Sequence, residues 1–345
     1  MAERHGILSK FIKDTWNIDS KVITEINEGS AKCFVIEAEK EKFFLKIYQE
    51  KFDVCTLNNE ISVCSFLSQK GFPVSCFLKS ENQTYVEKVQ DSLCTLQKFV
   101  EGTTFCKYEV PKEQLFDSVR VLAKINIALE ELPIQLPLGF DQEWFSEWSA
   151  DSAIEKYSNL LDQLDVDDIN YNRIAEDFNT KREIIERFDP KLYDFSYLTV
   201  ENTHGDYNVL QLIYDENGVK AVIDFASCSK LPLCWEIIRS YTLSSCECRE
   251  GIIDIDNFIS YVQEYMKIKT LHRSDLEMMP YFYLFTLMRS TFGYKSYIQK
   301  RRNNITVNEK DLNALEFAFW RTSMCKWLFE HSDELSLKLR SIVGE

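Results

Sequence analysis

Two aspartates, Asp206 and Asp224, flank a predicted β-hairpin with strands over Val209 to Tyr214 and Val219 to Ile223. The turn Glu216-Asn217-Gly218 suits a hairpin because Asn and Gly adopt positive φ at little cost. One acid precedes the first strand and the other follows the second, so the hairpin returns both to the same end of the sheet. Two carboxylates placed in this way can serve as a proton acceptor and as a ligand for a hard cation such as Mg²⁺.

The residues around this hairpin resemble a known catalytic loop. His204-Gly205-Asp206, then Gln211, and then Ile223-Asp224-Phe225 are similar to the catalytic loop and metal-binding aspartate of the aminoglycoside phosphotransferase and choline kinase-like family. The family includes spore-coat-type relatives and has the protein kinase-like fold. The tripeptide alone is a weak signal, but its combination with a hairpin and a correctly spaced Ile-Asp is much stronger.

The resemblance implies an α+β protein with two lobes. We expect residues 1–100 to form a small N-terminal nucleotide-binding lobe built on an antiparallel sheet. Residues 101–345 are expected to form a larger, mainly helical C-terminal lobe that carries the catalytic and substrate-binding residues. The similarity is strong over residues 203–240 and weaker over the rest of residues 20–300.

The family assigns roles to the residues of the catalytic loop. Asp206 matches the residue that accepts or orients the proton of the acceptor hydroxyl, and Asp224 matches the Mg²⁺ ligand. Gln211 stands where relatives have Asn, a second metal ligand; its amide oxygen is retained on a side chain one methylene longer. Asn208 is an alternative oxygen donor at a position that matches less well. His204 is expected to brace the loop.

The N-terminal part offers residues for the nucleotide phosphates. Lys46, in the β-rich run from Phe43 to Tyr48, matches the lysine that contacts the α- and β-phosphates, although such a lysine can also snorkel on an exposed face. Glu60, on a predicted helix, is its preferred acidic partner, with Glu50 or Asp53 as alternatives. Gly29 and Ser30 lie in a predicted turn that precedes Lys46 in the sequence, and they would cover the phosphates.

The segment from Gln97 to Gly102 resembles the hinge between the lobes, where backbone groups bind the adenine edge in this family. Gln97 and Phe99 are therefore expected at the nucleotide. The position alone carries this expectation, because main-chain contacts leave no side-chain signature.

Periodicity and breaker residues place the remaining elements. Strands are expected at 21–26, 33–38, 42–48, 74–79, 84–89 and 92–100, and helices within 1–20, 57–70 and 113–130. Asn126 lies in an apolar helical stripe and is expected to satisfy a buried hydrogen bond. Pro280 is expected to open a further helix, and a terminal helix is expected from about Asp311 to Phe329.

The composition of the chain limits the classes of molecule that it is expected to bind. The chain has 345 residues, 45% of them hydrophobic, and a formal net charge of −15, which disfavours nucleic acid or an anionic membrane as partner. The negative charge would favour a cationic substrate, or simply keep a protein soluble. No 18-residue apolar run or apolar leader is evident, so we expect a cytoplasmic protein. Eleven scattered cysteines are expected to be mostly reduced core thiols.

The sequence thus predicts a kinase that moves the γ-phosphoryl group of ATP to a hydroxyl of a small molecule, with Mg²⁺ as cofactor. GTP in place of ATP stays open, as does the acceptor, for which an aminoglycoside-like or other cationic alcohol is the first expectation and homoserine or a sugar an alternative. The alternative function is a non-catalytic relative of spore-coat type. A protein kinase is disfavoured because Asp224-Phe225-Ala226 departs from the D-F-G motif. Oligomeric state is not predicted.

Overall fold

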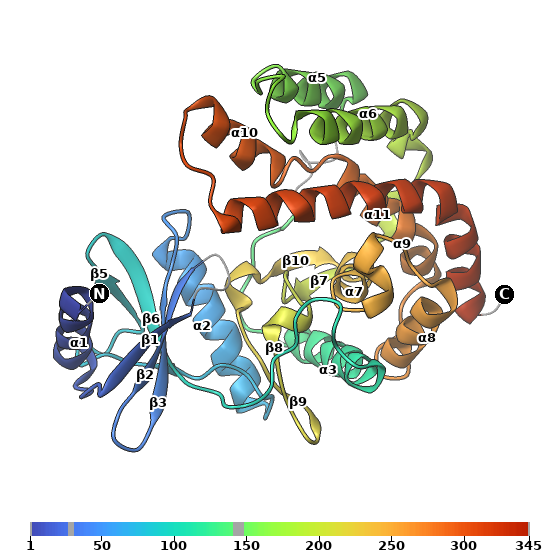
Figure 1. The fold of residues 1–345 in the computed structure, drawn as a ribbon. Helices are drawn as coiled ribbons and strands as arrows, with labels where there is room; N and C mark the ends of the chain where they lie inside the picture. The colour runs from blue at the N-terminus through green and yellow to red at the C-terminus, as the bar shows by residue number, and fades with distance from the viewer. Residues whose placement is uncertain (1, 27–30, 141–147, 344–345) are drawn as a thin grey trace.

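The computed structural model describes residues 2–26, 31–140 and 148–343 and shows two lobes of different composition (Figure 1). The N-terminal lobe contains an antiparallel sheet in the order β1-β2-β3-β6-β4, with β5 paired to β6. The strands of this sheet are β1 Val22–Ile26, β2 Lys32–Glu37, β3 Lys42–Ile47, β4 Phe77–Leu78, β5 Val86–Val89 and β6 Ser92–Lys98. Two helices belong to this lobe, α1 Ala2–Trp16 and α2 Val54–Gln69.

The alternation of side chains between the two faces of β3 determines on which face Lys46 lies. Phe43 and Leu45 are buried in one cluster with Leu8 and Ile12 of α1, so this face of the sheet is covered by α1. Successive side chains of a strand point to opposite faces. Lys46 therefore lies on the other face, away from α1, as the site requires.

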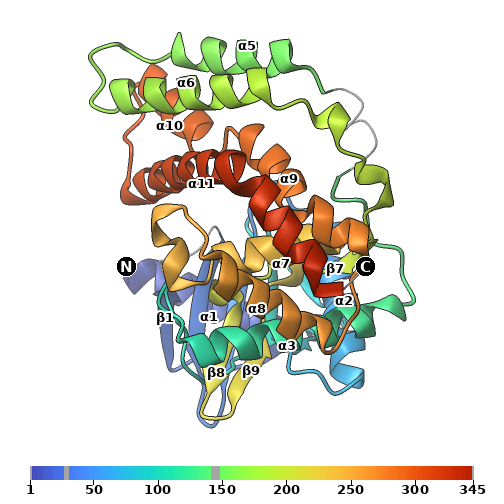
Figure 2. The same ribbon diagram turned by 90° about the vertical axis from the view of Figure 1, so that its right-hand side faces the viewer.

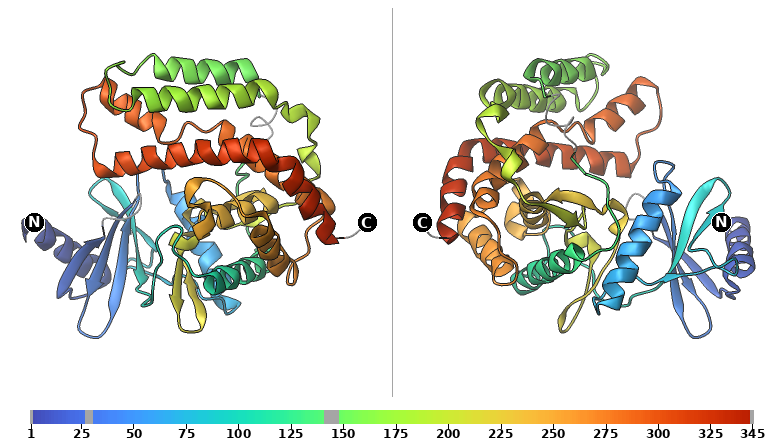
Figure 3. Two further views of the ribbon diagram at one scale, coloured as in Figure 1. Left: turned by 45° about the vertical axis from the view of Figure 1, so that its right-hand side comes forward. Right: turned by 180° about the vertical axis from the view of Figure 1, so that it is seen from behind.

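The C-terminal lobe is mainly helical. Its α-helices are α3 Lys112–Glu130, α5 Ala150–Leu161, α6 Tyr171–Arg187, α7 Leu233–Thr242, α8 Ile255–Met266, α9 Arg273–Met288, α10 Tyr294–Arg302 and α11 Glu309–Arg340. Two short sheets accompany them, β7 Val200–Thr203 with β10 Ser229–Pro232, and β8 Leu212–Asp215 with β9 Gly218–Val222. Figures 2 and 3 show α5 and α6 side by side as an outer layer over α11. One large apolar cluster joins these helices.

The sheet strands and helices of the N-terminal part follow the sequence predictions closely, but three predictions are wrong in detail. Residues 209–211 form a 3₁₀ turn, so the first hairpin strand starts at Leu212 rather than at Val209. Pro280 lies inside α9, which begins at Arg273 because His272 and Asp275 form a capping box there. The last helix continues to Arg340, well beyond Phe329.

Two further observations concern the expected setting of the protein. In the described part of the chain, no helix combines the length and the apolar character needed to cross a bilayer. All eleven cysteines are unpaired, and seven of them are buried: Cys33, Cys64, Cys94, Cys228, Cys234, Cys248 and Cys325.

Candidate active site

The loop that carries Asp206 is fixed by close packing at a glycine. It begins where β7 ends, and β7 pairs with β10, the strand that follows Asp224. Gly205 has φ +80°, and a Cβ at this position would lie 2.0 Å from the carbonyl oxygen of Ser227. Both the backbone conformation and the lack of space require glycine. The strands β7 and β10, which bring the two acidic loops together, were not predicted from the sequence.

His204 braces this loop. Its ring is fully buried, Nε2 lies 2.9 Å from the carbonyl oxygen of Ile223, and the N–H of Asp206 donates to Nδ1 over 3.2 Å. Nδ1 thus accepts while Nε2 donates, which is the pattern of a neutral imidazole. Burial lowers the pKa of His204, so the ring stays neutral. This geometry gives His204 an architectural part, as expected.

Glu236 on α7 stabilises the same loop through a hydrogen bond to its backbone. Its Oε1 accepts from the N–H of Gly205 over 2.7 Å, and its Oε2 accepts from Asn126 over 3.3 Å. Asn126 in turn accepts from the hydroxyl of Tyr265 over 3.0 Å. Burial raises the pKa of Glu236 to about 7. Asn126 therefore satisfies a buried hydrogen-bond network, as the sequence predicts, and does not face the reacting groups.

The carboxylate of Asp206 accepts hydrogen bonds from three side chains, the longest of them from Nδ2 of Asn208 to Oδ1 over 3.5 Å. Arg239 of α7 donates to Oδ1 over 2.5 Å, and Gln211 donates through Nε2 to Oδ2 over 3.2 Å. Asn208 caps the turn that follows: its Oδ1 accepts from the N–H of Leu210. Asn208 thus uses its oxygen within its own turn, which leaves Gln211 as the better candidate for an amide oxygen at a metal.

On the nucleotide side, Lys46 lies between two acids. Its Nζ is 2.6 Å from Oδ1 of Asp224 and 3.7 Å from Oε1 of Glu60, so both expected groups meet the lysine. The hydroxyl of Tyr48 donates to Glu60 over 2.9 Å and orients that carboxylate. Asp53, the alternative partner, instead caps the N-terminus of α2. Glu60 has the helical position that the sequence analysis preferred.

Charge and burial act in opposite directions in this cluster. Burial lowers the pKa of Lys46, but the charges of Glu60 and Asp224 outweigh it, so the pKa is raised and the ammonium is kept. Burial raises the pKa of Asp224, yet Lys46 brings it below its ordinary value. Burial raises the pKa of Glu60, which is 1% exposed. Asp224 is therefore ionised and only partly covered, with a side chain that is 40% exposed.

Asp224 and Gln211 have the donor chemistry of a magnesium site. Asp224 adopts the left-handed conformation, φ 63° and ψ 59°, which is uncommon outside glycine and typical of functional loops. The carboxylate oxygens of Asp224 and the amide oxygen of Gln211 are hard donors that Mg²⁺ prefers. Among the described residues, no group of three or more His, Cys, Asp or Glu side chains could hold a metal. These residues fit an ion that takes its remaining ligands from phosphates and water.

Two predicted parts of the nucleotide site are not placed beside Lys46 and Asp224 by the described structure. Gly29 and Ser30 lie outside the described residues. Gln97 is buried in β6, where it pairs with Phe44 of β3, and the N–H of Phe99 donates to the carbonyl of Lys42 over 3.1 Å. The N–H of Phe99 is thus engaged within the sheet, and adenine would have to contact other backbone groups of this segment.

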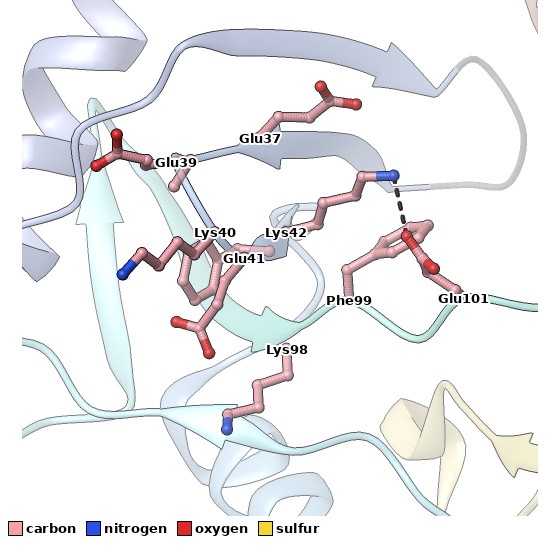
Figure 4. Close-up of a pocket in the computed structure, with 10 residues that line it drawn as sticks. Glu37, Glu39, Lys40, Glu41, Lys42, Lys98, Phe99 and Glu101 are labelled. Carbon is pink, nitrogen blue, oxygen red and sulfur yellow. Dashed lines mark hydrogen bonds and ion pairs between the residues drawn. The ribbon is translucent and has the colours of Figure 1, made fainter.

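A cavity of about 490 Å³ is lined in part by Phe99 (Figure 4). Most of its charged lining residues come from the β2–β3 hairpin, from Glu37 to Lys42, and Lys42 forms an ion pair of 3.0 Å with Glu101 at one side. None of Lys46, Asp206 and Asp224 lines it. This cavity is therefore separate from the catalytic groups.

A second cavity, of about 460 Å³, is connected to Asp206 through Arg239, which lines it. Its walls include residues of α5, α7, α9 and α11. The lining residues are Phe140, Lys156, Trp235, Arg239, Leu243, Tyr283, Thr286, Leu287, Arg289, Ser290, Phe317 and Arg321. We refer to this cavity as the α7–α11 pocket.

Sequence reasoning missed Arg239 and the pocket behind it. Arg239 follows Glu236 by three residues on a helix, so both side chains lie on one face. Because Glu236 lies in the segment that resembles the family, the spacing could have placed Arg239 near the catalytic loop. The other lining residues come from helices far apart in the sequence and left no local signal.

The fold and the site define a kinase-like phosphotransferase, and comparison with known proteins agrees. A family model described as the phosphotransferase enzyme family matches residues 22–258. The chain belongs to this family, which confirms the resemblance drawn from the catalytic loop and the expected class of enzyme. A search of curated proteins found no match.

Several solved structures share the fold. An amicoumacin kinase, in complex with AMP-PNP, Ca²⁺ and Ami, is 13% identical with a TM-score of 0.63, over 95% of this chain and 93% of that chain. A microcompartment-associated aminopropanol kinase has the same identity and TM-score, over 97% and 99%. A spectinomycin phosphotransferase in complex with ADP and spectinomycin is 12% identical with a TM-score of 0.60, over 95% and 98%. These similarities confirm the two-lobed, protein kinase-like fold.

Proposed function

We propose that this protein transfers the γ-phosphoryl group of ATP to a hydroxyl of a small molecule. The observation that carries this proposal is the Lys46–Asp224 ion pair of 2.6 Å, which joins β3 to the loop after β9. A lysine for the phosphates and an aspartate for the metal thus meet across 178 residues of sequence. Phosphoryl transfer needs this kind of positioning and charge neutralisation more than it needs covalent chemistry.

We assign the roles of the side chains accordingly. Lys46, held by Glu60 and Asp224, would contact the α- and β-phosphates, and Asp224 with Gln211 would hold Mg²⁺. Bound Mg²⁺ supplies neutralisation of the charge that develops on the phosphates. Asp206 would orient the acceptor hydroxyl and accept its proton.

The proposal also includes the identity of the nucleotide and the function of each lobe. ATP rather than GTP is supported by the adenine nucleotides named with two of the similar structures, AMP-PNP and ADP. Gly29, Ser30 and the backbone from Gln97 to Phe99 stay our candidates for the rest of the nucleotide site. We infer that residues 1–100 bind the nucleotide and that residues 101–345 supply the catalytic loop and the acceptor site, in a cytoplasmic protein.

Nucleotide binding tests the proposal without knowledge of the acceptor. We expect ATP or AMP-PNP to raise the melting temperature in a Mg²⁺-dependent manner, since a ligand stabilises the state that it binds. The Asp224→Asn variant should lose the Mg²⁺-dependent part. Slow release of inorganic phosphate from ATP, with water as acceptor, should fall in Asp206→Asn. If neither ATP nor GTP at millimolar concentration changes the melting temperature, the non-catalytic alternative replaces this proposal.

A further inference from the structure

The α7–α11 pocket concentrates positive charge beside the catalytic aspartate. Four of its lining residues are cationic, and none of the lining residues that the structure describes is acidic. The ammonium of Lys107 lies 3.8 Å from the ring centroid of Phe317, which lines the same pocket. The cationic lining residues are Lys156, Arg239, Arg289 and Arg321. This local excess of positive charge occurs in a chain whose net charge is −15.

The cations are close enough to affect one another. Burial, together with the charges of Arg239 and Arg321 and against the opposing charge of Asp206, lowers the pKa of Lys107 to about 8. The pKa of Lys156 is also lowered, first by burial and then by the neighbouring charges of Lys295 and Arg289. Like charges held together in this way repel each other, and an anion placed among them would remove that repulsion.

Aromatic rings support the guanidinium groups. Arg239 lies 5.3 Å from the ring centroid of Trp235, and Arg321 lies 5.2 Å from that of Phe317. Arg321 also donates to Oγ of Ser290 over 2.6 Å. A guanidinium stacked on a ring keeps its N–H donors along its edge, where they suit the planar fork of a carboxylate or the oxygens of a phosphate.

We propose that the acceptor alcohol carries an anionic group, a carboxylate or a phosphate, and that the α7–α11 pocket binds this group. The inference rests on the proposed function and names the acceptor class for the same site. The volume of about 460 Å³ suits a small molecule. Arg239, which contacts Asp206, connects the pocket with the reacting hydroxyl.

The transfer itself is balanced without a further reactant. The acceptor oxygen forms a bond to the γ-phosphorus, and the bond from that phosphorus to the bridging oxygen of ADP breaks. ADP leaves with the electron pair, and the hydroxyl proton passes to Asp206.

Local charge decides against a cationic acceptor in this pocket. The net charge of the chain acts at long range and is screened by salt over about 8–10 Å. A cation inside the pocket would instead meet several cations at short range, and like charges at contact distance reject a ligand. The anionic acceptor proposed here differs from the cationic alcohol that the net charge of the chain first suggested.

Melting temperature measured with charge-matched alcohols tests this inference. The protein is first saturated with AMP-PNP and Mg²⁺, so that the nucleotide site is filled, and ionic strength is held constant. Three probes are then titrated: 4-hydroxybutanoate, glycerol 3-phosphate and 4-amino-1-butanol. We expect saturable stabilisation by one or both anionic probes and none by the amino alcohol; the two anions distinguish a carboxylate site from a phosphate site.

Variants locate the effect. Lys156→Gln changes an exposed residue, so the fold should be kept, and it should weaken binding of the anionic probe by roughly fivefold. Arg289→Gln, on another helix, should act in the same direction. Lys326→Gln is the control, because Lys326 is an exposed lysine of α11 that does not line the pocket.

Three results would overturn the inference: stabilisation by the amino alcohol, no saturable effect of either anion, or equal effects in wild type and Lys156→Gln. The failure of this inference is distinguishable from that of the proposed function. Mg²⁺-dependent binding of AMP-PNP, measured without any probe, reports on the nucleotide site alone. A protein that binds AMP-PNP but discriminates among the probes in the opposite sense would keep the phosphotransferase and lose the anionic acceptor.

Discussion

The two sides of the catalytic loop differ in their balance of charge. On the nucleotide side, one cation, Lys46, is shared by Glu60 and Asp224, so the acids are in excess. On the acceptor side, one acid, Asp206, faces Arg239, and further cations line the pocket behind it. Among the described residues, acids outnumber cations on the first side, where Mg²⁺ would add positive charge, and cations outnumber acids on the second, where an anionic acceptor would add negative charge. One short loop can thus serve two ligands because its surroundings are charged in opposite senses.

The largest effect should come from removing the acid between the two sides. Asp206→Asn should lower the rate of phosphoryl transfer from ATP by about 10³-fold, because a positioned proton acceptor is lost. Nucleotide affinity should stay unchanged, since Asp206 belongs to the acceptor side. Phosphate release and AMP-PNP binding measure the two quantities, with Asp215→Asn, an exposed residue of the hairpin, as control. Equal loss of rate in both variants would contradict the assignment.

The loop that joins the two sides should not tolerate a side chain at Gly205. Gly205→Ala should lower the free energy of unfolding by about 3 kcal/mol or more, because positive φ and a 2.0 Å approach to Ser227 act together. Gly71→Ala is the matched control: Gly71 also has positive φ, +83°, but a Cβ there meets nothing within 4 Å. Denaturant titration should give roughly 1–2 kcal/mol for the control. Equal losses would show that the close contact contributes nothing.

Removing Lys46, the cation of the nucleotide side, should weaken nucleotide binding and leave Glu60 and Asp224 without its compensating charge. Lys46→Met should weaken AMP-PNP binding by roughly tenfold or more, through loss of charge-assisted hydrogen bonds. Burial would then raise the pKa of Glu60 without an opposing lysine, so its folded pKa lies above its unfolded value. The variant should therefore be more stable at pH 5 than at pH 8, because stability is lost as pH rises through the folded pKa.

The matched control for this change is Lys42→Met on the same strand, whose exposed ion pair with Glu101 should contribute little. If both lysine variants bind AMP-PNP as wild type does, the nucleotide site lies elsewhere.

The acceptor side should show a smaller dependence on pH. Lys107, with a pKa of about 8, faces Arg239, Arg321 and Asp206, and the arginines stay charged throughout. Lys107 is charged below pH 8 and loses its proton above it. Binding of glycerol 3-phosphate should thus weaken by roughly threefold between pH 7 and pH 9. Lys107→Met should remove this change; a variant with the wild-type pH profile would place the titrating group elsewhere.

Sequence reasoning found the residues with local signatures. His204, Asp206 and Asp224 lie in short motifs, and Glu60 lies on a well-delimited helix, so their neighbourhood could be predicted along with the fold. Their contacts need the fold: Gln211 donates to Asp206, although the sequence suggested a metal ligand. The two roles are compatible, because the NH₂ group donates the hydrogen bond to Asp206 and the amide oxygen can bind a metal.

The acceptor pocket could not be predicted in the same way. Its cations lie on α5, α7 and α11 and at the C-cap of α9, separated by many residues, so no spacing rule connects Lys156 with Arg321. The net charge of −15 averages over the whole surface and points to the opposite substrate charge. A composition constrains long-range attraction, whereas a binding pocket depends on the few charges that the fold brings together.

The most direct test of the account combines the two sides in one measurement of melting temperature, with AMP-PNP and Mg²⁺ as the first ligand and an anionic probe as the second. Asp224→Asn should lose the Mg²⁺-dependent shift caused by AMP-PNP and keep the shift caused by the anion. Lys156→Gln should keep the first shift and lose most of the second. An Asp224→Asn protein that retains the full Mg²⁺-dependent shift would contradict the central claim that this aspartate and Lys46 form the nucleotide site of a phosphotransferase.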